Sequence, residues 1–99
     1  MTARGTVLVV DDERGLREML SYELAMEGFE VEAVDSGAAA VEAVRRRKFD
    51  LALTDLKMPG MDGSATVEAL RSLDPDLEVI VATGYATVET AITCMKNGA

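Results

Sequence analysis

The stretch Phe49–Gly63, FDLALTDLKMPGMDG, begins as a buried strand and ends in a loop that contains proline and glycine. Its apolar run is followed at once by Asp55, and the loop behind that aspartate reads LKMPGMDG. An ionised carboxylate is costly to bury unless it is paired. The sequence therefore predicts that Asp55 lies at the rim of a sheet, where a carboxylate can do chemistry.

Composition limits the classes of protein to be considered. The chain has 99 residues, 48% of them hydrophobic, which predicts one globular domain over residues 1–99. Its formal net charge of -8 disfavours direct binding to nucleic acid or an anionic membrane, and favours a basic partner or a metal cation. The chain has one cysteine and no long apolar N-terminal stretch. We therefore expect a cytoplasmic location, with no disulfide, signal peptide or membrane span.

Apolar patterns predict four strands that alternate with four helices. Continuous apolar runs, at Thr6–Val10, in the opening stretch and at Leu77–Gly84, are typical of strands covered on both faces. The segment Phe29–Val34 alternates with charge, which is typical of an edge strand. This is the pattern of an α/β fold with a parallel sheet, in the order 2-1-3-4. Because the fourth strand has an interior sequence but would lie at an edge, we expect a fifth strand to be missing from this chain.

Helix boundaries and inward faces follow from caps and spacing. Gly28 is predicted to end the first helix, and Ser36 and Ser64 to cap the second and third. A fourth helix is expected over Tyr85–Asn97. The residues predicted to face the core from the first three helices are Leu16, Met19, Leu20, Leu24, Ala40, Val41, Val44, Val67, Leu70 and Leu73.

The basic run Arg45–Lys48 has two interpretations. It could be a patch that binds nucleic acid, or a solvated helix end whose charge matches the negative end of the helix dipole. The acidic composition of the whole chain favours the helix end.

Polar residues follow three of the predicted strands. Asp11 and Asp12 follow the first strand, Asp55 follows the third, and Thr83 ends the fourth. Ligands of open parallel sheets bind at the carboxyl ends of the strands, near the point where the strand order reverses. The predicted order places that point between the first and third strands, so we expect three aspartates and a hydroxyl to lie together.

Such a group of carboxylates favours a hard cation. Like charges repel unless something neutralises them, and oxygen ligands without histidine or cysteine favour Mg2+, with Mn2+ or Ca2+ next. Beside such an ion Asp55 could act as a nucleophile toward phosphorus. Asp11 and Asp12 would then anchor the metal, with help from the backbone carbonyl of Lys57, and Thr83 could hydrogen-bond a phosphoryl oxygen.

Each residue also has a simpler interpretation. Asp12 could serve only as a helix N-cap, Asp55 only as a turn residue, and Thr83 only as the last residue of a strand. The placement of all of them at the carboxyl ends of strands in one sheet favours a shared site.

The motifs VLVVDDE, DLALTDLKMPGMDG and VIVATGYATVETAITCMKNGA resemble the receiver domain of two-component response regulators. The resemblance covers nearly the whole chain, from Val7 to Ala99, and its last segment is most similar to receivers of the NtrC type. In those proteins the receiver precedes an ATPase that acts on sigma-54 polymerase, and a DNA-binding domain.

The resemblance implies a flavodoxin-like, CheY-like fold and a phospho-acceptor that promotes its own reaction without being an enzyme in the usual sense. Asp55 would accept the phosphoryl group from a sensor histidine kinase, and Thr83 would be the switching hydroxyl. Asp11, Asp12, Asp55 and the carbonyl of Lys57 would hold Mg2+. Output domains would lie in a longer protein.

This sequence also departs from the family. Receivers continue through a fifth strand, which carries a lysine that contacts the phosphoryl group, and a fifth helix; none of these is in this chain. We therefore expect an incomplete receiver that self-associates through the edge of its fourth strand.

Three other functions fit this sequence less well. A receiver fold that binds partners without accepting phosphate is disfavoured by the intact acidic residues. An aspartyl phosphohydrolase would usually carry a second aspartate where Lys57 stands. A flavodoxin would carry a phosphate-binding loop where this chain has DDERG.

Overall fold

The computed structural model describes residues 5–54 and 63–81 of the chain. Strands and helices alternate through these residues, as the sequence predicts. The elements are β1 (Thr6–Val10), α1 (Arg14–Met26), β2 (Glu30–Val34), α2 (Gly37–Arg46), β3 (Leu51–Thr54), α3 (Gly63–Leu73) and β4 (Glu78–Val81). The predicted fourth helix lies outside the described residues.

The four strands form one parallel sheet in the order β2-β1-β3-β4. The predicted order is thus confirmed, and so is the position of β2 at an edge. In the central pair, Val7 of β1 lies beside Leu51 of β3, and the register continues to Val10 beside Thr54. The two central strands therefore end level with each other.

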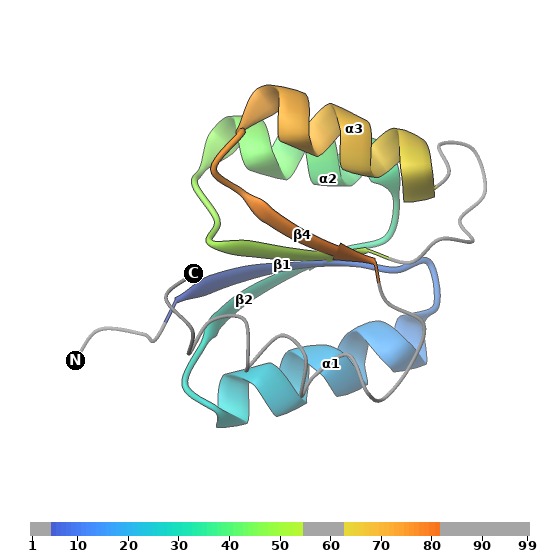
Figure 1. Ribbon diagram of the computed structural model, residues 1–99. Helices are drawn as coiled ribbons and strands as arrows, with labels where there is room; N and C mark the ends of the chain where they lie inside the picture. Colours follow the sequence, from blue (N-terminus) through green and yellow to red (C-terminus); the bar gives the residue numbers. More distant parts are fainter. Residues whose placement is uncertain (1–4, 55–62, 82–99) are drawn as a thin grey trace.

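Helices cover both faces of the sheet, with α1 on one side and α2 and α3 on the other (Figure 1). In β1, Val7 and Val9 pack with the α1 side of the core, whereas Leu8 and Val10 pack with the α2 and α3 side. All four side chains are buried. This two-sided burial is the physical reason for the continuous apolar run in the sequence.

The predicted ends of the first two helices are confirmed. Gly28 follows α1 with a φ of 96°, a left-handed conformation that glycine adopts at little cost. Ser36 precedes α2, and its Oγ accepts a hydrogen bond from the N–H of Ala39 at 3.1 Å.

Two predictions about α3 are wrong. The helix begins at Gly63, so Ser64 is its second residue and not its N-cap. Leu73, which the sequence predicts to face the core, is 41% exposed, because it is the last residue of α3 and is followed by an exposed turn. The inward positions Val67 and Leu70 do pack against the core.

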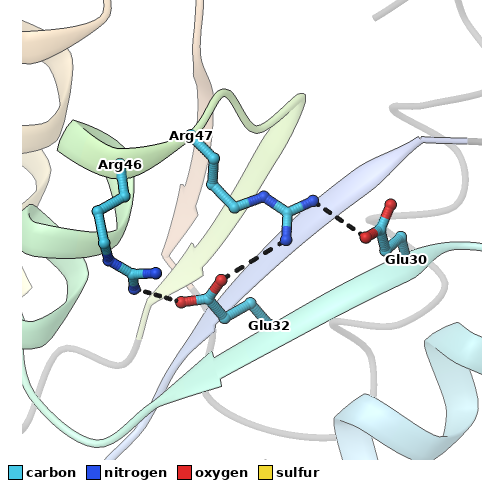
Figure 2. Close-up of polar contacts among 4 residues, drawn as sticks. All are labelled: Glu30, Glu32, Arg46 and Arg47. Carbon is cyan, nitrogen blue, oxygen red and sulfur yellow. Dashed lines mark hydrogen bonds and ion pairs between the residues drawn. The ribbon is translucent and has the colours of Figure 1, made fainter.

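The basic run at the carboxyl end of α2 contacts acidic residues of the chain itself (Figure 2). Arg46 donates to Glu32 at 2.8 Å, and Arg47 donates to Glu30 at 3.1 Å. A second nitrogen of Arg47 lies 3.7 Å from Glu32, and its guanidinium lies 5.1 Å from the centre of the Phe49 ring. These contacts join the end of α2 to the edge strand β2.

A pair of substitutions in α1 tests the packing of the helix on the sheet. Leu24→Ala removes a side chain that is 0% exposed, so we expect a loss of roughly 2–5 kcal/mol in the free energy of unfolding. Met26→Ala, at a side chain that is 70% exposed, should change it by less than about 0.5 kcal/mol. Urea unfolding followed by circular dichroism measures both, and equal losses would contradict the described packing.

A second pair tests the contacts of the basic run. Arg47→Ala should cost about 1 kcal/mol, because the side chain loses an aromatic contact as well as its ion pairs. Arg45→Ala removes a more exposed arginine that contacts Glu42 at 3.5 Å, and should cost less than about 0.5 kcal/mol. Urea unfolding at low and high salt measures both losses. If Arg47→Ala loses no more free energy of unfolding than Arg45→Ala does, the contacts described for Arg47 do not stabilise the fold.

Candidate functional site

The candidate site lies at the carboxyl end of the central strands. β1 ends at Val10 and β3 at Thr54, and these two residues are neighbours in the sheet. Asp11 and Asp12 follow β1 directly and lead into α1. The other predicted site residues, Asp55, Lys57 and Thr83, lie outside the described residues.

Asp11 is buried at this edge and is held by several hydrogen bonds. It is 3% exposed, and its N–H donates to the carbonyl oxygen of Val34 in β2 at 3.1 Å. Its carboxylate oxygen Oδ1 accepts a hydrogen bond from the N–H of Glu13 at 2.9 Å. Its own carbonyl oxygen accepts a bond from the guanidinium of Arg17 at 3.0 Å. The backbone and the carboxylate of Asp11 are therefore both fixed by the fold.

Asp12 is exposed at the surface next to this buried carboxylate. The alternative that Asp12 serves only as the N-cap of the first helix is wrong, since the residue before α1 is Glu13. Glu13 itself makes no side-chain cap bond. Capping of α1 therefore does not explain why an aspartate stands at position 12.

The described donors suit a hard cation. The edge offers one buried and one exposed carboxylate in consecutive positions, and the chain contains no histidine. Within residues 5–54 and 63–81, no group of three or more acidic, cysteine or histidine side chains could hold a metal ion. Mg2+ commonly uses only one or two carboxylates and keeps several waters, so Asp11 and Asp12 fit part of a magnesium site.

Sequence reasoning missed one residue of this edge, Arg17. It is the fourth residue of α1, where the first turn closes, and it is partly buried. A buried carbonyl at the end of a strand needs a donor, and an arginine six residues further on could have been considered for it. Helical spacing alone indicated only a polar position on α1.

Comparison with known proteins places these residues in a family. The model of the response regulator receiver domain matches residues 7–99. The response regulator protein FleR of Pseudomonas aeruginosa is 43% identical over 93 residues, which are 94% of this chain and 20% of that protein. The DNA-binding transcriptional regulator NtrC of Escherichia coli is 35% identical over 96 residues, 97% of this chain and 20% of NtrC. The chain thus spans about a fifth of the length of these relatives.

Solved structures agree with this assignment. The response regulator TrrA of Thermotoga maritima, crystallised in complex with Mg2+-BeF, superposes with a TM-score of 0.76 and 31% identity, over 94% of this chain and 78% of TrrA. NtrX of Brucella abortus, in complex with ATP, superposes with a TM-score of 0.78 and 30% identity, over 97% of this chain and 22% of NtrX. Among the described residues, no helix has the length and apolarity needed to cross a membrane.

The two aspartates should differ in their effect on the metal-free fold. Asp11→Ala removes the acceptor of the Glu13 N–H and should lower the free energy of unfolding by about 1 kcal/mol. Asp12→Ala removes an exposed charge next to a like charge, so the free energy of unfolding should stay unchanged or rise slightly. Urea unfolding in the presence of EDTA measures both, and a larger loss for Asp12→Ala would contradict the described roles.

Proposed function

The chain belongs to the response regulator receiver domain family, and on that basis we propose that it accepts a phosphoryl group on Asp55 from a sensor histidine kinase. Mg2+ would be held by Asp11, Asp12, Asp55 and the backbone carbonyl of Lys57. Thr83 would contact the phosphoryl group and carry the change in conformation. The reaction would take place in the cytoplasm.

One observation carries this proposal, the register of the two central strands. Val10 and Thr54 are neighbours, and each is followed directly by an aspartate, Asp11 or Asp55. Asp55 is joined by one peptide bond to Thr54, the neighbour of Val10, and consecutive Cα atoms are about 3.8 Å apart. This supports a site in which the acceptor stands beside the acidic pair.

The chemistry proposed for Asp55 is a nucleophilic displacement. A carboxylate oxygen of Asp55 forms a bond to phosphorus, and the bond from phosphorus to the donor nitrogen or oxygen breaks, with its electron pair leaving on the donor. Bound Mg2+ would neutralise charge on the phosphoryl oxygens. The chain's own contribution is to hold Asp11 rigidly and to keep the acidic pair at the rim of the sheet.

The relatives support the magnesium and the acceptor role. TrrA, which shares 31% identity with this chain, was crystallised with Mg2+-BeF. By analogy, we expect this chain to bind Mg2+ at the equivalent strand ends. In this account the receiver domain promotes its own phosphorylation and dephosphorylation, while the phosphoryl group comes from the kinase.

The output would belong to a longer protein. The relatives include transcriptional regulators of the NtrC type, of which this chain matches about 20%. We propose that phosphorylation shifts the receiver between two conformations and thereby controls output domains that act with sigma-54 polymerase. In the described sheet, β2 lies at one edge and β4 at the other. We propose that the chain self-associates through the edge of β4.

The acceptor is tested by intact mass after incubation with acetyl phosphate. We expect one added phosphoryl group in the wild-type protein with Mg2+, and none with EDTA or in Asp55→Asn. Asp50→Asn is the matched control, because Asp50 precedes the same strand, accepts the Thr6 N–H at 2.8 Å and should not affect labelling. Labelling of Asp55→Asn, or none in a folded wild type, would refute the assignment.

A further inference from the structure

Arg17 makes a contact that the proposed reaction does not use. Its guanidinium nitrogen donates to the backbone carbonyl oxygen of Asp11 at 3.0 Å, across six positions of sequence. We propose that Arg17 is a positioning residue for the cation site, which fixes the peptide between the two metal-binding aspartates. This proposal rests on the proposed function, since it concerns how Asp11 and Asp12 present their carboxylates to Mg2+.

The peptide bond between Asp11 and Asp12 couples the positions of the two residues. The carbonyl of Asp11 and the N–H of Asp12 belong to one planar unit. A hydrogen bond that fixes the carbonyl oxygen therefore fixes the plane, and with it the position of the Asp12 Cα atom. The bond from the N–H of Glu13 to the Asp11 carboxylate restrains the backbone on the other side of Asp12. Because Asp12 is exposed, packing does little to hold this position.

The contact of Arg17 completes a set of three. The N–H of Asp11 is bonded to Val34 of β2, and its carboxylate is bonded to the N–H of Glu13, just before α1. Arg17 adds a bond from the body of α1 to the remaining backbone group of Asp11. Asp11, the buried member of the acidic pair, is thus tied to the edge strand, to the turn and to the helix that follows it.

Positioning and electrostatics predict opposite results when Arg17 is removed. A positive charge near the site repels a divalent cation, so the loss of charge alone would strengthen Mg2+ binding. Loss of the bond to Asp11 would instead weaken binding, because the carboxylates would have to be ordered when the metal binds. Outer contacts that orient metal ligands typically contribute on the order of tenfold in affinity.

Arg14 provides the matched control on the same helix. It carries the same charge, but its guanidinium pairs with Glu18 at 3.0 Å, and its side chain is 83% exposed. Removal of Arg14 should therefore reveal the effect of charge without a change in the position of Asp11.

The experiment is a calorimetric titration of Mg2+ into the wild type and the variants Arg17→Ala, Arg17→Lys and Arg14→Ala. We expect Arg17→Ala to raise the Kd for Mg2+ on the order of tenfold. Arg17→Lys, which keeps a donor on a long side chain, should bind more tightly than Arg17→Ala. Arg14→Ala should bind as the wild type does, or slightly more tightly. If Arg17→Ala does not fold, Arg17→Met takes its place with the same expectation, because it keeps most of the apolar stem.

A second readout needs no metal. Amide hydrogen exchange at Glu13 should be faster in Arg17→Ala than in the wild type, while exchange in the core strands is unchanged. Unchanged or tighter Mg2+ binding by Arg17→Ala would overturn the role of Arg17, as would an equal weakening in Arg14→Ala. Absence of Mg2+ binding by the wild type would overturn the proposed function itself, and this proposal with it.

Discussion

The parallel pairing of β1 with β3 is the constraint on which the rest of the structure depends. Each strand supplies side chains to both layers of the core, and the register brings Val10 and Thr54 level at the carboxyl end. A shift by one residue would exchange the side chains that a strand supplies to the two layers, so that Val7 and Val9 would have to fit where Leu8 and Val10 pack. The core therefore fixes the register, and the register fixes the place at which the acidic residues leave the sheet.

Rigidity at this edge connects the fold to the proposed chemistry. Asp11 is buried and bonded to β2, to the turn and to α1, so this residue of the proposed site is held in place by the fold itself. Preorganised charge costs little reorganisation during a reaction. In a receiver domain, little of the free energy of phosphorylation is then needed to order the site, and more of it can drive a change of conformation.

The sequence predicted what local patterns determine and missed what tertiary placement determines. The edge position of β2 followed from its alternating charge, and the cap at Ser36 followed from its residue type. The bond of Arg17 to Asp11 and the contacts of Arg47 with β2 were not predicted, because they depend on how each helix lies on the sheet. The roles of Asp55, Lys57 and Thr83 remain predictions from the sequence and the family.

We propose that the acidic edge at the carboxyl ends of β1 and β3 binds a divalent cation. Line broadening of amide NMR signals by Mn2+ tests it most directly, because paramagnetic broadening falls steeply with distance from the ion. The account predicts the strongest broadening at Asp11, Asp12 and Glu13, with little at Thr6 and Asp50, at the opposite end of the same strands. Broadening centred on the glutamates of β2, or none at the carboxyl edge, would contradict it.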